Sequence, residues 1–538
     1  MNIRLAQINP TVGDLDGNTN LIIETIQSSP ECAFVVFPEL SITGYPPQDL
    51  LLDSGFIDKV GKKLNLIKDN VGTRTVVVGL PRYSNGELFN SAAIINNGEI
   101  IGYHDKALLP TYDVFDEKRY FEPSNRIEPF KVTLGEKSIS VGIQICEDLW
   151  DGEYDLNISD TLIDKGAEMI INISASPYRK KIIDKRLSLC IDKSNHLKYF
   201  FIYCNMVGAQ DELVFDGRSF IVNSAGKVEV MGAAFREDII DFDTESISSS
   251  RSNQVTVKQP EELFRALSLG VKDYFQKSNF SKAVIGLSGG IDSALTAAIA
   301  TDAIGSDNVI GVSMPSRFSS QHSKDDAISL AKNLGIKFES IPINETFSCL
   351  LSEMGTFFKG TESGLAEENL QARIRGNILM SIANKINALV LNTGNKTELA
   401  LGYCTMYGDM CGALGVISDL NKIEVYEVSK WLNNSNKEDI IPQSSIDKDP
   451  SAELRENQYD PFDYNIVSPI VDYIVNDMMD QKSLSKMGYD IKLVKEIQNK
   501  IYLSEYKRRQ APPGIKVSEK AFGIGRRFPI INKYRGIK

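Results

Sequence analysis

Short apolar runs bounded by polar turn residues recur along the first 245 residues. They occur at 34–37, 75–78, 139–143, 169–171 and 200–203. Several of these runs are apolar throughout instead of alternating with polar residues, a pattern typical of strands that are covered on both faces. We therefore expect residues 1–245 to form an α/β layered domain.

A second pattern begins beyond a polar segment. Residues 246–260 are rich in Ser and lack an apolar period, so we expect a linker there. Residues 261–275 have helical spacing, and strand, loop and helix then alternate, with strands expected at 283–287, 309–312, 338–343 and 388–391. This order predicts a parallel, doubly wound sheet in a domain of residues 261–538, with ligands bound beyond the carboxyl ends of its strands.

A long polar stretch interrupts the second pattern at 442–461. It contains many Ser, Asp, Glu and Asn residues. Two interpretations stay open here, a lid that moves over a site and an ordinary surface loop.

Composition limits the class of protein. The 538 residues are 42% hydrophobic and 24% charged, which is typical of globular chains. A net charge of -12 gives no general attraction for nucleic acid or for an anionic membrane. No apolar run approaches the ~20 residues that a membrane-spanning helix needs, and the chain starts on a strand-like pattern without a signal peptide. We expect no nucleic-acid partner and no membrane partner.

Cysteine and histidine usage adds to this picture. The seven cysteines, from Cys32 to Cys411, form no disulfide framework and no CxxC pair for zinc, so we expect a cytoplasmic protein with reduced thiols. There are only three histidines, His104, His196 and His322, which argues against a histidine-rich metal site. A cysteine nucleophile in this chain would need another kind of base.

The string SGGIDS follows the first expected strand of the second domain. Its two adjacent glycines, Gly289 and Gly290, join a strand to a helix and let backbone N–H groups approach an anion at the helix N-terminus. A Ser-Gly-Gly turn alone could be no more than a tight connection. The full string resembles the loop of the N-type ATP pyrophosphatases, which split ATP between the α and β phosphates.

That resemblance implies an ATP site and a magnesium ion. The residues it assigns to ATP are Gly286, Leu287, Ser288, Gly289, Gly290, Ile291, Asp292 and Ser293. Asp292 is expected to bind Mg²⁺ as well, because a carboxylate beside a polyphosphate is unfavourable without a cation between them.

Three further strings, at 366–377, 393–398 and 506–514, stand in order behind SGGIDS. Together the four strings resemble the NAD synthetase family, which amidates the nicotinate carboxylate of deamido-NAD. The resemblance assigns Met314, Arg317, Thr393 and Lys396 to ATP, Asn369, Arg375, Glu398 and Lys507 to deamido-NAD, and Glu398 also to the metal.

The C-terminal segment is basic although the chain is acidic. Residues 507–538 hold ten Lys or Arg and a single acid, Glu519. A solvated tail is one interpretation. We favour a tail that closes over a polyphosphate, since an adenylating site must screen ATP and a dinucleotide.

Three strings in the first domain each place one reactive side chain at or just after a strand end. They are Phe37 to Leu40, Gly102 to Lys106 and Gly142 to Asp148. In order, their residues Glu39, Lys106 and Cys146 resemble the catalytic triad of the nitrilase or carbon–nitrogen hydrolase superfamily, which implies an α-β-β-α layered fold.

The triad has a chemical rationale. A thiol of pKa about 8.5 needs a base at pH 7, and Glu39 would take the proton of Cys146 and later activate water. Lys106 would stabilise the oxyanion together with the backbone N–H of Glu147. We expect Glu147 and Asp148 to support the site from outside it.

The resemblance also implies glutamine contacts. Tyr112 stands where glutamine-dependent members have a tyrosine that contacts glutamine, and Ser176 stands at the family's serine before proline, with Ser174 as the alternative. Six residues after Ser176 the family usually has Lys or Arg, but this chain has Ile182, which follows Arg179, Lys180 and Lys181, so a shifted lysine would have to compensate.

These assignments imply an enzyme that takes deamido-NAD, ATP with Mg²⁺, and glutamine or ammonia, and that forms NAD⁺. The family resemblance also implies a homo-oligomer, a dimer through the synthetase domain or larger. Two alternatives stay open. A GMP synthetase-like amidotransferase would share SGGIDS but lack the 506–514 string and the triad, and a silent nucleotide-sensing scaffold would keep both folds without turnover.

Overall fold

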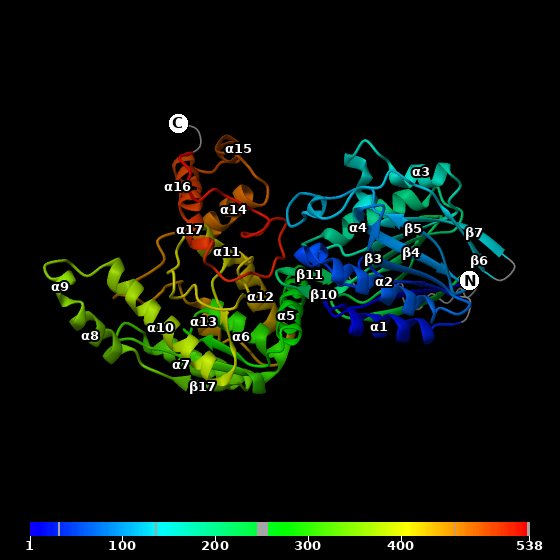
Figure 1. The fold of residues 1–538 in the computed structure, drawn as a ribbon. Coiled ribbons are helices and arrows are strands. Elements are labelled where there is room, and N and C mark those ends of the chain that lie inside the picture. The colour runs from blue at the N-terminus through cyan, green and yellow to red at the C-terminus, as the bar shows by residue number, and fades with distance from the viewer. Residues whose placement is uncertain (31–32, 135–136, 245–256, 457, 535–538) are drawn as a thin grey trace. The chain divides into compact units, whose positions relative to one another are not determined.

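The computed structural model describes residues 1–30, 33–134, 137–244, 257–456 and 458–534. The chain forms two compact units, unit 1 (Met1–Thr256) and unit 2 (Val257–Lys538), which are described separately (Figure 1). Most of the expected linker, up to residue 256, lies outside the described residues, and residues 259 and 260 already belong to the first helix of unit 2.

Unit 1 contains two large β-sheets and four α-helices among its described residues. The strands are β1 (Asn2–Gln7), β2 (Phe34–Val36), β3 (Thr75–Ser84), β4 (Glu87–Asn96), β5 (Glu99–Asp105), β6 (Phe130–Leu134), β7 (Lys137–Ile145), β8 (Met169–Ser174), β9 (Phe200–Asn205), β10 (Val207–Gln210), β11 (Leu213–Asp216), β12 (Phe220–Asn223), β13 (Val228–Met231) and β14 (Asp238–Asp243). The helices are α1 (Leu15–Gln27), α2 (Ser54–Lys68), α3 (Ile158–Asp164) and α4 (Ile182–Ser194), with 3-10 turns η1 (Gln48–Leu52), η2 (Glu117–Arg119) and η3 (Cys146–Glu153).

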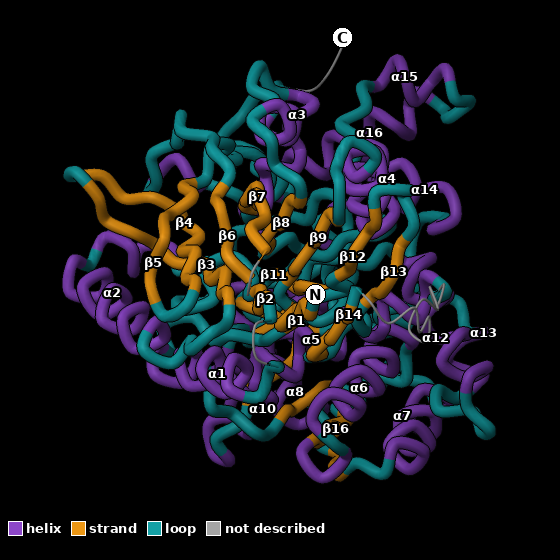
Figure 2. The backbone as a smooth tube through the Cα atoms, turned by 90° about the vertical axis from the view of Figure 1, so that its right-hand side faces the viewer, coloured by secondary structure: helices purple, strands orange, loops and turns teal. Residues whose placement is uncertain are grey.

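The sheets of unit 1 pack face to face between two helical layers. One sheet has the order β14-β1-β2-β3-β4-β5 and the other β13-β12-β9-β8-β7-β6. Leu5 and Val36 of the first sheet share a buried core with Ile143 and Ile171 of the second. Helices α1 and α2 cover the outer face of the first sheet, and α3 and α4 that of the second (Figure 2). This is the expected α-β-β-α sandwich.

The predicted apolar runs of unit 1 form strands that are covered on both faces, as expected. Those at 34–37, 75–78, 139–143, 169–171 and 200–203 form β2, β3, β7, β8 and β9. These strands lie inside the two sheets and are covered by the opposite sheet on one face and by helices on the other, so both faces are apolar.

Unit 2 alternates strands and helices as its sequence predicts. The strands are β15 (Ala283–Gly286), β16 (Val309–Ser313), β17 (Lys337–Ser340), β18 (Leu389–Asn392) and β19 (Leu414–Gly415). The helices are α5 (Gln259–Lys277), α6 (Ile291–Ile304), α7 (Gln321–Leu334), α8 (Asn344–Glu353), α9 (Gly355–Phe358), α10 (Leu365–Ile386), α11 (Lys396–Leu401), α12 (Lys422–Ser435), α13 (Gln443–Asp447), α14 (Tyr464–Val475), α15 (Gln481–Lys486), α16 (Ile491–Leu503) and α17 (Glu505–Arg508), with the 3-10 turn η4 (Ser306–Asn308).

The sheet of unit 2 is parallel and has the order β17-β16-β15-β18-β19. The chain runs from β15 outward to β17 and then returns to β18 on the other side of β15. The strand order therefore reverses between β15 and β18, which brings the loops after these two strands together at the carboxyl edge. Strand β19 has only two residues and was not predicted.

Helices cover both faces of this sheet. Helices α8 and α10 pack on one face through Phe347, Ile374 and Leu379, and α6 packs on the other together with α5 and α12. A separate apolar cluster joins α11, α14 and α16. The polar stretch 442–461 begins with α13. Within the described ranges, no helix combines the length and apolar character needed to cross a membrane.

Candidate active sites

Three strand ends of unit 1 bring the expected triad together. Glu39 follows β2, Lys106 follows β5, and Cys146 directly follows β7. The Lys106 ammonium donates to Glu39 Oε1 at 2.8 Å, and Glu39 and Lys106 are almost completely buried. The second oxygen of Glu39 accepts from the backbone N–H of Ala175 at 2.9 Å. The carboxylate is therefore fixed from both sides.

Cys146 sits at a strained turn between β7 and η3. Its φ is 44°, in the left-handed region that costs a non-glycine residue about 1–3 kcal/mol. Burial raises the pKa of its thiol well above the usual value, the Glu39 carboxylate raises it further, and Lys106 lowers it. The thiol is therefore neutral at rest, and a neutral thiol becomes a nucleophile only with a base beside it.

A fourth residue, with an ionisable side chain, completes this site, and it was not predicted from the sequence. Glu117 in η2 is buried and accepts from the Lys106 ammonium at 2.9 Å and from the Tyr45 hydroxyl at 3.0 Å. Burial raises the pKa of Glu117 to about 7, against the opposing effect of Lys106. In the sequence its string, EKR, is typical of solvated charges, so no local signal indicated this contact.

Tyr112 contacts Glu147, the residue that follows Cys146. Its hydroxyl donates to Glu147 Oε2 at 3.0 Å, and the hydroxyl of Tyr154 donates to Glu147 Oε1 at 2.8 Å. The Tyr112 side chain is half exposed, so it can still meet a small molecule at the site. Glu147 is held in place from outside the triad.

Ser176 lies in the loop after β8 and contacts a buried cation. The Arg186 guanidinium donates to Ser176 Oγ at 3.0 Å and pairs with Asp216 at 2.7 Å. Ile182 is buried as the first residue of α4. The alternative, Ser174, instead donates to Asn172 within the core. The basic residue that the structure brings to Ser176 is thus Arg186.

The SGGIDS string of unit 2 joins β15 to α6. The Gly290 backbone N–H donates to Ser288 Oγ at 3.2 Å, and Ser293 Oγ donates to the Gly290 carbonyl at 3.0 Å. Gly289 has a φ of +80°, and a Cβ there would lie 2.2 Å from the Ser323 carbonyl oxygen. Only glycine fits this loop as it packs against the first turn of α7.

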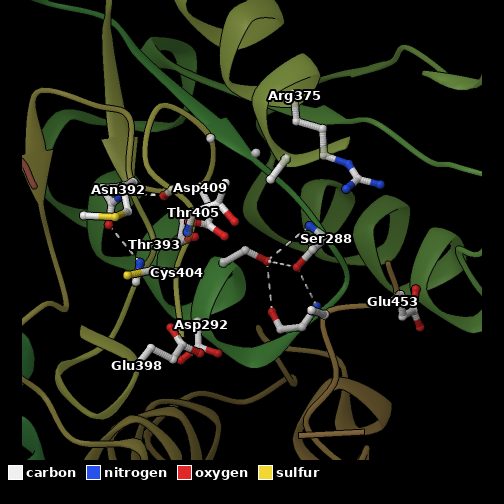
Figure 3. A pocket seen from close by; sticks show the side chains of 18 of the residues that line it. Ser288, Asp292, Arg375, Asn392, Thr393, Glu398, Cys404, Thr405, Asp409 and Glu453 are labelled. Carbon is white, nitrogen blue, oxygen red and sulfur yellow. Dashed lines mark hydrogen bonds between the residues drawn. The ribbon is translucent and has the colours of Figure 1, made fainter. Parts of the chain in front are cut away.

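A pocket of about 410 Å³ opens at the carboxyl edge of the sheet (Figure 3). Most of the expected residues line it: Gly286, Leu287, Ser288, Gly290, Ile291, Asp292, Ser293, Met314, Asn369, Arg375, Thr393, Glu398 and Lys507. Arg375 extends into it from α10, and its Nε donates to the Met314 carbonyl at 3.0 Å. This volume is typical of small-molecule sites.

Three expected residues do not line this pocket. Gly289 shapes the loop from behind, and Arg317 is exposed beyond β16. Lys396 is 1% exposed and pairs with Asp419 at 3.1 Å and with Asp472 at 3.3 Å. The ammonium of Lys396 therefore lies in a buried ion cluster and not beside the pocket.

Asp292 and Glu398 lie side by side in the pocket (Figure 3). Burial raises the pKa of Glu398 to about 8, and the neighbouring Asp292 carboxylate raises it as well. Lys422 pairs with Asp292. In the described part of the chain no cluster of three or more His, Cys, Asp or Glu side chains could hold a metal. Two carboxylates that repel each other still fit Mg²⁺, which usually takes one or two carboxylates and completes its shell with phosphate and water.

Three lysines of the pocket, Lys324, Lys422 and Lys448, were not predicted from the sequence. Lys422 begins α12, and Lys448 lies in the polar stretch 442–461. Lys448 donates to Glu453 at 2.6 Å, and Glu453 also accepts from Ser323 Oγ at 2.8 Å at the N-terminus of α7. The available signal was the polar stretch 442–461 itself, for which a lid over a site and an ordinary surface loop were both left open. From the basic C-terminal segment, Lys507 lines the pocket.

Two family models match this chain. The model described as carbon-nitrogen hydrolase matches residues 2–250, and the model described as NAD synthase matches residues 263–511. The first match contains the buried triad and the second contains the pocket. The fold prediction, a nitrilase-like unit followed by a synthetase unit, is confirmed.

Relatives extend over the whole chain. The glutamine-dependent NAD(+) synthetase of Synechocystis is 42% identical over 99% of both chains, and that of Thermotoga maritima is 40% identical over 99% of both. A structure of the glutamine-dependent NAD+ synthetase of Acinetobacter baumannii, in complex with adenosine diphosphate, has a TM-score of 0.79 at 34% identity and covers 99% of this chain and 98% of that one. The chain therefore belongs to the glutamine-dependent NAD(+) synthetase family.

Proposed function

We propose that this enzyme forms NAD⁺ from deamido-NAD, with ATP as the activating substrate and glutamine as the nitrogen donor. The observation that carries the proposal is the buried contact of Glu39 with Lys106 beside Cys146, in a chain whose second unit holds an anion-binding loop and a nucleotide-sized pocket. One unit supplies ammonia and the other consumes it.

In unit 1, Cys146 attacks the side-chain amide of glutamine. Glu39 takes the thiol proton and passes it to the leaving nitrogen, so ammonia departs and a glutamyl thioester remains. Water then attacks the thioester, with Glu39 again as the base, and glutamate is released. The Lys106 ammonium and the Glu147 backbone N–H stabilise the oxyanion in both steps. Tyr112 and Ser176 are the proposed glutamine contacts.

In unit 2, the nicotinate carboxylate of deamido-NAD attacks the α-phosphorus of ATP. Pyrophosphate leaves, and the acyl adenylate is a far better electrophile than the carboxylate. Ammonia then displaces AMP to give NAD⁺. The SGGIDS loop, with the N-terminus of α6, offers backbone N–H groups to the phosphates. We leave Lys396 and Arg317 out of the ATP site because neither lines the pocket.

Further assignments belong to the same proposal. Met314 and Thr393 contact ATP, and Asn369, Arg375, Glu398 and Lys507 contact deamido-NAD. Asp292 and Glu398 would hold Mg²⁺, which when bound screens the phosphate charge. We add Lys448 as a phosphate contact, because its ammonium lines the pocket near the loop.

We also propose a domain division, a cellular location and an oligomeric state. A domain division at 1–245, 246–260 and 261–538 is supported by the two family-model ranges. A cytoplasmic location is supported by the six cysteines of the described ranges, which are all free. A homo-oligomer, with a dimer through the synthetase unit, rests on the family resemblance, and light scattering of the purified protein tests it.

One assay tests the proposed reaction. Purified protein is incubated with deamido-NAD, ATP, Mg²⁺ and either glutamine or ammonium chloride, and the products are separated by chromatography. We expect NAD⁺ and AMP in equal amounts with either donor, and glutamate only with glutamine. Glutamate without NAD⁺ would refute the dinucleotide substrate, and ATP binding without any turnover would refute the enzyme function.

A further inference from the structure

The segments that carry Lys106 and Cys146 come from different sheets. Lys106 follows β5, the edge strand of the first sheet, and Cys146 follows β7 in the second sheet. No ladder of backbone hydrogen bonds pairs β5 with β7 in the sheet orders of the described residues. The relative position of the ammonium and the thiol therefore depends on contacts across the gap between the sheets.

One buried carboxylate makes such contacts on both sides. Asp148 Oδ1 accepts from the backbone N–H groups of Ala107 at 3.1 Å and of Leu108 at 2.9 Å, directly after Lys106. Asp148 Oδ2 accepts from the backbone N–H of Ile145 at 3.0 Å, directly before Cys146. These bonds tie the two catalytic segments to a single rigid group.

A fourth donor completes the shell of this carboxylate. His104 Nε2 lies 3.2 Å from Asp148 Oδ2, and both side chains are almost completely buried. Because a carboxylate only accepts, the ring must carry its proton on Nε2. His104 belongs to β5, so this bond also joins the Lys106 strand to η3.

We propose that Asp148 is a positioning residue that holds the Lys106 segment and the Cys146 segment in register for glutamine hydrolysis. This inference rests on the proposed function, because it needs Lys106 and Cys146 to be the catalytic pair. Asp148 itself is 0% exposed and its oxygens are filled by protein donors, so it acts through the two segments and not on glutamine.

The substitution Asp148→Asn tests this role with little change in volume. The asparagine amide has one accepting oxygen and one donating NH₂ group. Its NH₂ group must therefore face the backbone N–H groups of one of the two segments, where two donors meet and no hydrogen bond can form. Freed on that side, the lysine can move relative to the thiol, and a misplacement of 1 Å at a reacting centre costs about 10²-fold in rate. We expect kcat for glutamine-driven NAD⁺ synthesis to fall about 10²-fold while KM for glutamine changes less than about 3-fold.

Asp151 offers a matched control in the same turn. It is also buried in η3, accepts from the backbone N–H of Ser159 at 3.1 Å and pairs with Lys193 at 2.5 Å, away from the Lys106 segment. Asp151→Asn makes the same chemical change at a buried carboxylate that accepts from one backbone N–H and one lysine. It should therefore lower the stability of unit 1 but keep kcat with glutamine within about 3-fold of the parent.

The measurement is steady-state NAD⁺ synthesis by the full-length parent and variants, with glutamine and separately with ammonium. The inference is supported if kcat falls only in Asp148→Asn and only with glutamine as the nitrogen donor, while KM stays unchanged. Equal losses of kcat in the two variants, or an effect on the KM for glutamine in place of kcat, overturn it. If Asp148→Asn also loses ammonium-driven synthesis, the variant His104→Ala is measured in its place. A kcat of His104→Ala that is lower only with glutamine supports the inference, and kinetics equal to those of the parent overturn it. A parent that cannot use glutamine would instead refute the proposed function.

Discussion

Gly289 provides the sharpest test of the ATP loop. A Cβ at this position would lie 2.2 Å from the Ser323 carbonyl oxygen, whereas ordinary contacts begin near 3.4 Å. The obstacle is backbone, so in Gly289→Ala the loop must move by about 1 Å, which costs about 10²-fold in rate when reacting groups are misplaced. The left-handed φ of +80° adds about 1–2 kcal/mol of destabilisation.

Gly335 separates these two effects. It also has a positive φ, +66°, but a Cβ there meets nothing closer than 3.9 Å. Both alanine variants should therefore lose stability in thermal unfolding, Gly289→Ala the more because of its clash, while only Gly289→Ala should lose kcat/KM for ATP, about 10²-fold, in ammonium-driven synthesis. Parental kcat/KM for ATP in Gly289→Ala, or an equal loss in Gly335→Ala, would refute the idea that the loop's contact with α7 sets the phosphate site.

Three further predictions concern buried charges. Asp292→Asn should abolish synthesis with both nitrogen donors in the chromatographic assay, and retained ammonium-driven activity would exclude this carboxylate as a metal ligand. Lys396→Met should lower the free energy of unfolding of unit 2 by about 3–5 kcal/mol, because it removes the cation paired with the buried Asp419 and the partly buried Asp472, while exposed Lys272→Met should change it by less than about 0.5 kcal/mol; equal urea midpoints would contradict this. Burial raises the pKa of Glu117 to about 7, so protonation of this carboxylate below pH 7 weakens its ion pair with Lys106. The rate of glutamate release should therefore fall as the pH drops through 7. The same fall in Glu117→Gln would show that another group titrates.

The sequence predicted most buried strands of the two units, and it singled out three residues, Glu39, Lys106 and Cys146, that the structure brings together. Cys146 directly follows β7 and Glu39 lies just after β2, so predicting these two strands from their apolar runs also placed both side chains at strand ends, whereas Lys106 follows β5, which contains no such run. The parallel order of unit 2 likewise located the loops after β15 and β18 at one edge. Local pattern and tertiary structure agree at these positions.

Contacts between distant segments could not be predicted. Lys396 and Glu398 belong to one string, but they are two residues apart in α11, about 200° around the helix axis. Glu398 therefore faces the pocket while Lys396 faces Asp419 and Asp472. Glu117 contacts Lys106 from the segment between β5 and β6, which contains only the 3-10 turn η2, and no periodic pattern encodes such a contact.

The central claim is that one unit makes ammonia and the other uses it. The most direct test is Cys146→Ala, assayed for NAD⁺ formation with saturating glutamine and, separately, with saturating ammonium chloride. We expect glutamine-driven synthesis to fall at least about 10³-fold, since the nucleophile is lost, and ammonium-driven synthesis to stay within about 2-fold of the parent. Equal loss with both donors, or continued use of glutamine, would contradict this division between the units.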